Sequence, residues 1–302
     1  MGDRQVPRTV LRGPYAIVEA PSVLGLRPTG VEELPQALIE LGLAERLNAR
    51  VAFRVDPPAY DPVRDPDTRM LNPRAIRDYS VRLADAVGRV LSDGDFPVVL
   101  GGDCSILLGN LLALRRRARY GLLFIDGHAD FYQPEANVNG EAASSELALA
   151  TGRGPDVMAA PGGYRPLVRD EDVVAFAHRD AGEAARYRSQ PLPESLRSID
   201  LETVRRVGAG TAARRAMAHL ERDELAGVWI HLDADALDDA IMPAVDYRMP
   251  QGLSWEELET VLRQARASAH AVGLDVTIYN PRLDPDRRAG RKLVRAIANA
   301  LV

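Results

Sequence analysis

Two short acidic runs, far apart in the chain, carry residue types that bind divalent metal ions. Residues 126–130 read DGHAD and residues 231–235 read HLDAD. Each run follows an apolar segment, so its carboxylates would lie at the end of a buried strand, away from water. Removing carboxylates from water costs free energy unless another group compensates their charge. Divalent cations would compensate it. The two runs therefore predict a metal site with carboxylate and imidazole ligands.

The spacing within each run favours convergence of these side chains. In an extended strand alternate side chains share a face, so we expect Asp126, His128 and Asp130 to point the same way. The second run repeats the spacing with His231, Asp233 and Asp235. The alternative interpretation is that both runs are strand ends where the chain turns, because Asp favours loops.

A third segment reads GGDCS at residues 101–105, between an apolar run at 97–100 and a helical pattern that opens near Ile106. Its glycines permit a sharp turn and a close approach of the backbone. The turn would leave Asp103 or Cys104 at the carboxyl end of a strand, where ligands bind in open α/β sheets.

Apolar runs alternate with helical patterns along the whole chain, which is typical of a parallel sheet covered by helices. The expected strands are 15–18, 51–55, 96–100, 121–125, 173–177, 227–232 and 272–278. The expected helices are 34–41, 74–91, 106–117, 202–219, 255–268 and 287–301. Asn72 before Pro73 is typical of a helix N-cap, and Ser254 with Glu257 of a capping box. Both acidic runs then fall at carboxyl ends of strands.

Bulk properties narrow the class of protein. The 302 residues are 46% hydrophobic and show no linker or repeat, so we expect one α/β domain over residues 1–302. A net charge of -5 without a basic face argues against nucleic-acid binding. No apolar stretch approaches the roughly 20 residues that span a bilayer, and no signal-peptide core is present, so we expect a cytoplasmic protein without membrane contact. A single cysteine, Cys104, excludes an internal disulfide and suits a reducing compartment.

Taken in order, the three segments resemble the ureohydrolase superfamily of arginases, agmatinases and formiminoglutamases. The family pattern is Gly-Gly-Asp-His, then Asp-Ala-His-x-Asp, then Asp-x-Asp-x-x-Asp, and the resemblance extends over nearly the whole chain to Asn280-Pro281. It implies an α/β fold, a three-layer α/β/α sandwich with a central, mainly parallel eight-stranded sheet. It also implies a homo-oligomer, a trimer or a hexamer.

The resemblance further implies two Mn²⁺ ions per chain. The implied ligands are Cys104, Asp126, His128, Asp130, Asp233 and Asp235. Asp126 and Asp233 would bridge the ions, and oxygen and imidazole ligands suit manganese. The implied reaction is hydrolysis of a non-peptide C–N bond in a linear amidine or guanidino compound, by attack of a metal-bridging hydroxide. Asp130 would orient this hydroxide and pass its proton to the departing amine.

Cys104 departs from the family pattern, which has a histidine ligand at this position. A thiolate would add a negative charge and a soft donor, favouring ions such as zinc over manganese. One bound ion, or another divalent metal, is therefore an open alternative. So is a small buried cysteine that packs behind the site without binding metal.

The positions that bind the substrate and relay protons in the family also differ in this chain. Ala143 aligns with a histidine that relays protons in arginases, and Ile278 aligns with a glutamate that holds the guanidinium, a task that isoleucine cannot perform. Glu141 is a candidate replacement acid or base, or else a solvated loop residue. His231 is a candidate proton shuttle, or else a histidine with hydrogen-bond partners one layer deeper.

These observations predict a manganese-dependent hydrolase of a small linear amidine or guanidino compound. The alternative is a metal-binding protein with the ureohydrolase fold but without amidinohydrolase activity, serving as a structural or regulatory oligomer subunit. The missing histidine and glutamate motivate that alternative.

Overall fold

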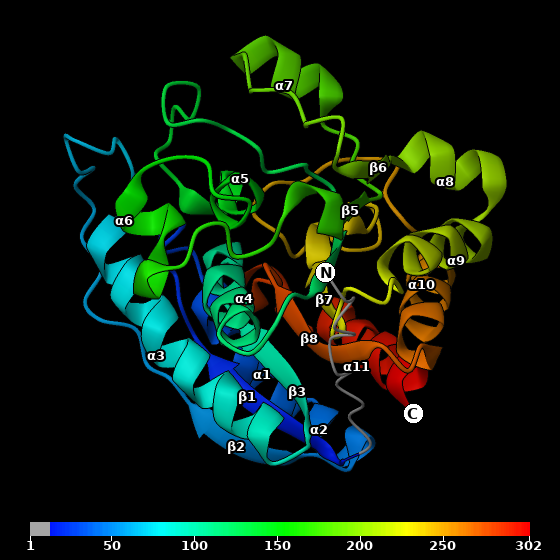
Figure 1. Cartoon of the computed structure of the whole chain (residues 1–302). Helices are drawn as coiled ribbons and strands as arrows, with labels where there is room; N and C mark the ends of the chain where they lie inside the picture. Colours follow the sequence, from blue (N-terminus) through cyan, green and yellow to red (C-terminus); the bar gives the residue numbers. More distant parts are fainter. Residues whose placement is uncertain (1–12) are drawn as a thin grey trace, which may run out of the picture.

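The computed structural model describes residues 13–302, and within this range eight strands form one sheet. The strands are β1 (Tyr15–Ala20), β2 (Arg50–Arg54), β3 (Phe96–Gly101), β4 (Gly121–Ile125), β5 (Val173–Phe176), β6 (Arg197–Ile199), β7 (Val228–Asp233) and β8 (Ala271–Thr277). Their order across the sheet is β2-β1-β3-β8-β7-β4-β5-β6, and every pairing is parallel (Figure 1). This confirms the predicted α/β class with an eight-stranded sheet.

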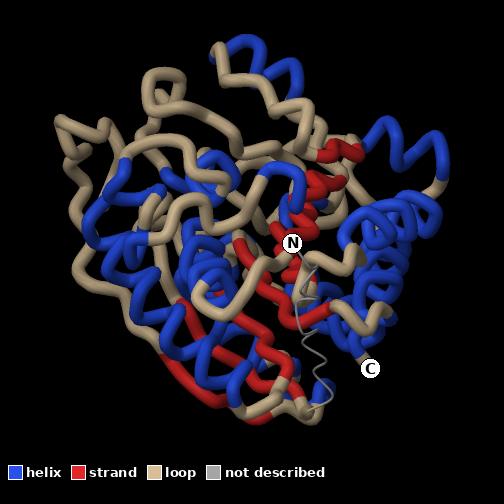
Figure 2. The backbone as a smooth tube through the Cα atoms, viewed as in Figure 1, coloured by secondary structure: helices blue, strands red, loops and turns tan. Residues whose placement is uncertain are grey.

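Helices cover both faces of this sheet, giving three layers (Figure 2). They are α1 (Leu34–Glu40), α2 (Leu43–Leu47), α3 (Pro73–Ser92), α4 (Leu107–Arg115), α5 (Glu146–Ala150), α6 (Asp156–Ala159), α7 (Ala181–Tyr187), α8 (Leu201–Val207), α9 (Ala209–Leu220), α10 (Trp255–Ala267) and α11 (Arg288–Leu301). No helix in the described part of the chain is long and apolar enough to cross a membrane.

The alternation of side chains along each strand builds two separate cores. Leu122 and Phe124 of β4 join the core beneath α3 and α4, whereas Leu123 and Ile125 join the core beneath α9, α10 and α11. Because both faces are buried, the central strands are apolar throughout, as parallel sheets require.

Local sequence signals explain where elements begin and end. Ser254 and Glu257 form the predicted capping box of α10. The helix expected over 202–219 is interrupted at Gly208, whose φ of +82° ends α8 before α9 begins. Pro73 begins α3 as predicted, but Asn72 does not cap it: the Asn72 side chain accepts from the Asp61 amide at 2.7 Å and donates to a loop carbonyl instead.

The strand ends bring the acidic runs together. Strands β3, β8, β7 and β4 are neighbours in that order, so their carboxyl ends meet at one edge of the sheet. Strand β4 ends at Ile125, so the predicted extended face of Asp126, His128 and Asp130 is wrong, and these residues lie in the following loop. Strand β7 continues through Asp233. Convergence in the first run therefore depends on loop conformation rather than on strand alternation.

Candidate metal centre

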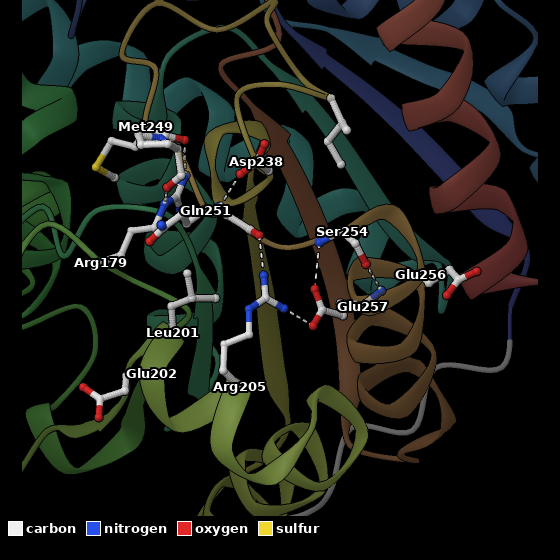
Figure 3. A pocket seen from close by; sticks show the side chains of 13 residues that line it. Arg179, Leu201, Glu202, Arg205, Asp238, Met249, Gln251, Ser254, Glu256 and Glu257 are labelled. Carbon is white, nitrogen blue, oxygen red and sulfur yellow. Dashed lines mark hydrogen bonds and ion pairs between the residues drawn. The ribbon is translucent and has the colours of Figure 1, made fainter.

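Two cavities flank the loop that follows β7. In the larger, about 1170 Å³, most of the charged side chains of the lining have partners within the chain (Figure 3). Arg205 pairs with Glu257 and donates to the Gly252 carbonyl at 2.6 Å, while Asp238 accepts from the amides of Ala240 and Gly252. These contacts serve the fold of the loop, and they leave no buried charge that needs a ligand.

Arg179 connects that cavity to the second acidic run. Its guanidinium donates to the backbone carbonyls of Asp235 at 3.0 Å, Leu237 at 3.2 Å and Met249 at 2.9 Å. Burial lowers the pKa of Arg179. Nearby carboxylates, including Asp235, partly offset this decrease. Arg179 thus holds the β7 loop in place from behind.

The smaller cavity, about 170 Å³, contains the predicted site on its floor. Cys104, His128, Asp130, Asp233 and Asp235 all line it. The remaining lining residues are Leu26, Tyr132, Ala136, Asn137, Val138, Asn139, Ala143, Ser144, Glu183, Tyr187, Tyr247 and Ile278. The structure therefore brings residues of all three sequence segments to one pocket.

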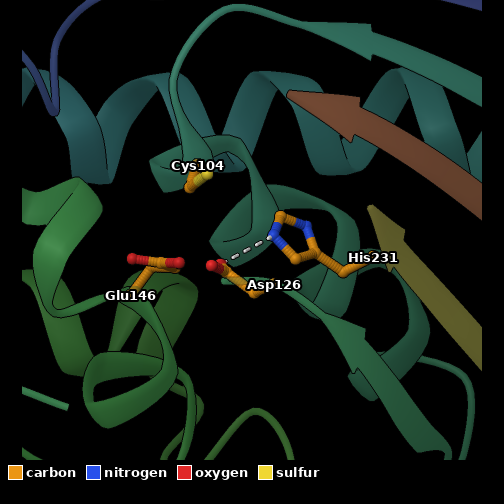
Figure 4. A group of neighbouring side chains, drawn as sticks. All are labelled: Cys104, Asp126, Glu146 and His231. Atoms are coloured by element: carbon orange, nitrogen blue, oxygen red, sulfur yellow. Dashed lines mark ion pairs between the residues drawn. The ribbon is translucent and has the colours of Figure 1, made fainter. Parts of the chain in front are cut away.

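At the floor and directly behind it, metal-binding atoms form two groups that share Asp126. One group comprises Cys104, Asp126, Glu146 and His231, and the other comprises Asp126, His128 and Asp235. In each group the potential ligand atoms lie within 4.8 Å of one another. Figure 4 shows the first group, whose four side chains point toward a common centre.

The turn after β3 positions Cys104. Asp103 accepts from the Ser105 amide at 2.8 Å and from the Ser22 hydroxyl at 3.0 Å, so its carboxylate is used in the turn. A Cβ at Gly102 would come within 1.8 Å of the Ser22 carbonyl oxygen, so this close approach requires glycine. Cys104 is then the residue that faces the cluster.

The Cys104 thiol has two polar neighbours. It donates to Asp233 Oδ2 at 2.8 Å, and its sulfur lies 3.1 Å from Thr277 Oγ1. Burial and the neighbouring carboxylates, Asp233 foremost, raise the pKa of this thiol well above its usual value. Without a cation the group remains a thiol.

Gly127 allows the two acidic loops to touch. Its amide donates to Asp235 Oδ1 at 3.1 Å, and a Cβ here would lie 2.7 Å from the Asp235 carbonyl oxygen. His128 Nδ1 lies 3.0 Å from Asp235 Oδ2. Burial opposes the charged imidazole, but Asp235 and neighbouring carboxylates raise the pKa of His128 well above its usual value.

His231 lies behind the pocket and is completely buried. Its Nδ1 lies 2.6 Å from Asp275 Oδ2, and the Trp229 indole also donates to Asp275. The ring stacks on Phe124 with centroids 4.8 Å apart. His231 does have a deeper hydrogen-bond partner, but its Nε2 faces the other way, toward Asp126 Oδ2 at 4.0 Å.

Glu146 is the member of the cluster that the sequence interpretation missed. It opens α5, a short helix that follows no strand, and its side chain is fully buried. Neither carboxylate oxygen meets hydrogen-bond geometry, although Asp130 lies close enough to interact with it electrostatically. The only sequence signal is a charged residue at the start of the apolar segment ELALA at 146–150.

The cluster concentrates buried polar atoms without partners. Within residues 13–302, eight buried side-chain atoms lack a hydrogen-bond partner, and four belong to this cluster: Asp126 Oδ2, both carboxylate oxygens of Glu146, and His231 Nε2. Buried polar atoms in folded proteins nearly always have partners. A divalent cation would satisfy all four, so the residues present fit a metal ion.

Electrostatics support the same conclusion. Burial foremost, and then neighbouring carboxylates, raise the pKa of Asp130, Glu146 and Asp233 well above the usual range. Glu146 also makes a fifth carboxylate beside the four that the sequence predicted. Such a concentration of buried negative charge is stable only with bound protons or cations.

Ile278 lines the pocket, whereas Glu141 does not. Ile278 lies just beyond the end of β8 with φ +71°, and its side chain faces the pocket. Glu141 is buried rather than solvated: Tyr247 donates to its carboxylate, and Arg27 Nε lies 3.7 Å away. Glu141 does not join the metal-binding groups.

Comparison with known proteins places the chain in a family. Residues 13–302 match the model of the arginase family. The chain belongs to the arginase family. It is 28% identical over 281 residues to the arginase of Bacillus caldovelox, covering 90% of this chain and 92% of that protein. It is also 28% identical over 278 residues to human arginase-1, covering 88% and 85%.

Solved structures agree with this assignment. The Bacillus caldovelox arginase structure superposes with a TM-score of 0.86 at 27% identity, covering 96% of this chain and 98% of that one. The proclavaminate amidinohydrolase of Streptomyces clavuligerus shares the fold, with a TM-score of 0.69 at 19% identity and coverage of 98% and 96%. The resemblance inferred from sequence is confirmed: the chain is an arginase-family ureohydrolase with candidate metal-binding residues.

Proposed function

We propose that this arginase-family chain is a metal-dependent hydrolase that cleaves a non-peptide C–N bond in a linear amidine or guanidino compound. The observation that carries the proposal is the buried cluster behind the pocket, where four polar atoms lack a hydrogen-bond partner. A pocket that opens onto such a cluster can bring a substrate carbon next to activated water.

The proposed metal ligands at the pocket are Cys104, Asp126, His128, Asp130, Asp233 and Asp235. Their carboxylate and imidazole groups suit two Mn²⁺ ions, while the thiol favours a softer ion at one position. Bound divalent ions would lower the pKa of water and so supply a nucleophile at neutral pH.

Protons are handled by residues that face the pocket. Asp130 lines it, so its carboxylate is placed to accept a proton from a water molecule at the cluster. The carboxyl group that results can transfer this proton to a departing amine. Glu141 and His231 do not line the pocket, so a role for either in proton transfer would act through Tyr247 or Asp126 respectively.

The pocket lining favours a cationic substrate. Among the described residues that form it, Glu183 adds a carboxylate and Tyr132 and Tyr187 add phenols, while no Lys or Arg is present to bind a substrate carboxylate. Ile278 contributes an apolar wall where the family has a glutamate. A positively charged amidine whose tail carries no carboxylate fits this lining best.

The test is a turnover panel with Mn²⁺-loaded protein. Arginine, agmatine, hydroxyarginine, guanidinobutyrate and formiminoglutamate are each assayed for release of the free amine together with urea, hydroxyurea or formamide as the compound requires, with chelator-treated protein as the control. We expect metal-dependent turnover, faster with agmatine than with arginine because agmatine lacks the carboxylate. No turnover of any compound by protein that holds two manganese ions would contradict the guanidino assignment.

The second candidate is a metal-binding protein without this activity, which acts as a structural or regulatory oligomer subunit. Ile278 and Ala143 favour it, because neither can replace the polar side chain that the family has there. Fewer than one metal ion per chain by mass spectrometry would support it, and two tightly bound ions would argue against it. A homo-oligomer, a cytoplasmic location and one domain over residues 1–302 remain predictions.

A further inference from the structure

Glu146 and His231 lie where the family pattern of the three segments assigns no ligand, yet both contribute unpartnered buried atoms to one cluster. We propose that both are metal ligands, and that with Cys104 and Asp126 they form a site of one sulfur, two carboxylates and one imidazole that takes a zinc-like ion. This inference rests on the proposed function in one respect, that the cluster binds metal.

The contacts of His231 prepare one ring nitrogen for a metal. Asp275 lies 2.6 Å from Nδ1 and also accepts from Trp229, so it assigns the imidazole proton to Nδ1. The lone pair of Nε2 then faces Asp126 Oδ2 across 4.0 Å. That gap is too long for a hydrogen bond. It is compatible with two atoms that bind the same ion, each at about 2.0–2.2 Å from it.

Such a carboxylate behind a histidine is a common feature of metal sites. Metal-binding histidines usually donate their other N–H to a carboxylate or carbonyl, which fixes the tautomer and the ring orientation. Stacking on Phe124 holds the ring further. Asp275 is therefore a positioning residue for His231.

Glu146 supplies the second carboxylate. Its side chain is fully buried, neither oxygen meets hydrogen-bond geometry, and its near neighbour Asp130 is another carboxyl group rather than a cation. An ionised carboxylate in this situation would cost several kcal/mol without a counter-charge. Its oxygens point toward Asp126 and Cys104, where an ion would supply that charge (Figure 4).

The two groups of ligand atoms then differ in chemistry. The group with Cys104 contains sulfur, which together with imidazole and carboxylate is typical of four-coordinate zinc. The group of Asp126, His128 and Asp235 contains only oxygen and nitrogen, which suits manganese. Asp126 belongs to both, so a centre with two different ions is the arrangement that the side chains favour.

The test uses Co²⁺ as a spectroscopic probe of metal-free full-length protein. Wild type should show a thiolate-to-cobalt charge-transfer band and the visible bands of a four-coordinate ion, and Cys104→Ser should lose the charge-transfer band alone. Glu146→Gln and His231→Asn should each weaken binding of the first equivalent by at least about tenfold and alter the visible bands. Glu202→Gln and His219→Asn, outside the cluster, serve as matched controls.

Two further measurements test the inference if Glu146→Gln or His231→Asn does not fold. Asp275→Asn changes little volume but removes the negative charge and leaves one acceptor oxygen for the two donors, His231 and Trp229, so it should weaken Co²⁺ binding by roughly 10–100-fold. In Co²⁺-loaded wild type, proton NMR should show a paramagnetically shifted, slowly exchanging imidazole N–H from His231, because this N–H is buried against Asp275.

The outcomes separate this inference from the proposed function. Wild-type Co²⁺ affinity and spectra in both Glu146→Gln and His231→Asn would overturn the inference while leaving a metal centre with the family ligands in place. A wild-type protein that binds neither Co²⁺, Zn²⁺ nor Mn²⁺ would overturn both.

Discussion

The floor of the pocket and the loop beside it differ in whether their buried polar atoms have hydrogen-bond partners. At the floor, Asp126, Glu146 and His231 hold buried atoms that no side chain or backbone group satisfies. In the loop over residues 137–141, Glu141 accepts from Tyr247, and the Asn137 side chain donates to the Glu141 carbonyl at 2.7 Å and accepts from the Gly140 amide at 2.8 Å. The polar groups of the loop are paired within the chain, whereas those of the floor lack hydrogen-bond partners and fit a cation.

This difference indicates which part of the family chemistry the chain has kept. The floor retains the carboxylates of the family pattern and adds Glu146 to them. Above it, Ile278 and Ala143 replace the polar groups with which arginases hold the guanidinium and relay protons. The candidate metal ligands have therefore diverged less from the family pattern than the positions above them, and substitutions in the two regions should have different effects.

The largest effect is expected from Asp126→Asn, because Asp126 belongs to both groups of ligand atoms. We expect loss of bound metal and a fall in turnover of more than about 100-fold, beyond the 10–100-fold typical when only an outer partner of a ligand is lost. Metal content and kcat/KM are measured beside Asp78→Asn, an exposed carboxylate on α3. Retention of both metal and turnover would remove Asp126 from the centre.

Metal removal should reverse the pH dependence of stability. Burial foremost raises the pKa of Asp130, Glu146 and Asp233 in the folded state, so the metal-free fold binds protons more tightly than the unfolded chain. Its stability is then greatest in acid and is lost as pH rises from about 4 through the raised values. We expect Tm with chelator to fall by on the order of 5 °C from mildly acidic to neutral pH.

Metal-loaded protein is the control for that scan. Because a bound cation favours the ionised carboxylates, the gain in Tm on adding metal should grow as pH rises over the same interval. A metal-free protein whose Tm rises steadily with pH would show that these carboxyl groups are not destabilised by burial.

The fold was largely predictable because burial on both faces makes the central strands continuous apolar runs. The exception is β6, which has three residues, lies at the sheet edge and exposes Arg197 and Ser198, so no apolar run marks it. The helix break at Gly208 was also missed, since one glycine inside a periodic pattern does not reveal its φ. Pairing with neighbours, rather than local sequence, defines such elements.

An intermediate effect is expected from Ile278→Glu. It restores a carboxylate to the pocket and replaces a β-branched residue at positive φ, a conformation that such residues rarely adopt. A charged hydrogen bond to a guanidinium should raise kcat/KM for guanidino substrates by about tenfold or more. Ile278→Gln, of similar size without the charge, is the matched control. Equal rates for both variants would indicate that the guanidinium binds elsewhere.

The smallest effect is expected from Glu141→Gln. A glutamine can still accept from Tyr247, and the side chain does not join the metal-binding groups, so kcat/KM should change by less than about tenfold. Turnover is measured together with Tm to separate activity from folding. A loss of about 100-fold or more at unchanged Tm would instead assign Glu141 the acid or base role that the sequence allowed.

The floor was predictable only in part. Residues that follow apolar runs, such as Asp126 and Asp233, carry a local signal, because a parallel strand delivers its carboxyl end to the site. Glu146 lies on a short helix that reaches the cluster only through the tertiary fold. His231 was noticed, but its orientation depends on Asp275 of the neighbouring strand, a contact set by sheet register.

Anomalous scattering from crystals grown with Zn²⁺ and Mn²⁺ tests the central claim most directly, because it locates each ion and identifies it. The account predicts a zinc peak within about 2.0–2.3 Å of Cys104 Sγ, His231 Nε2 and carboxylate oxygens of Asp126 and Glu146. It also predicts a second peak beside His128 and Asp235. A centre without metal, or ions that contact neither Glu146 nor His231, would contradict it.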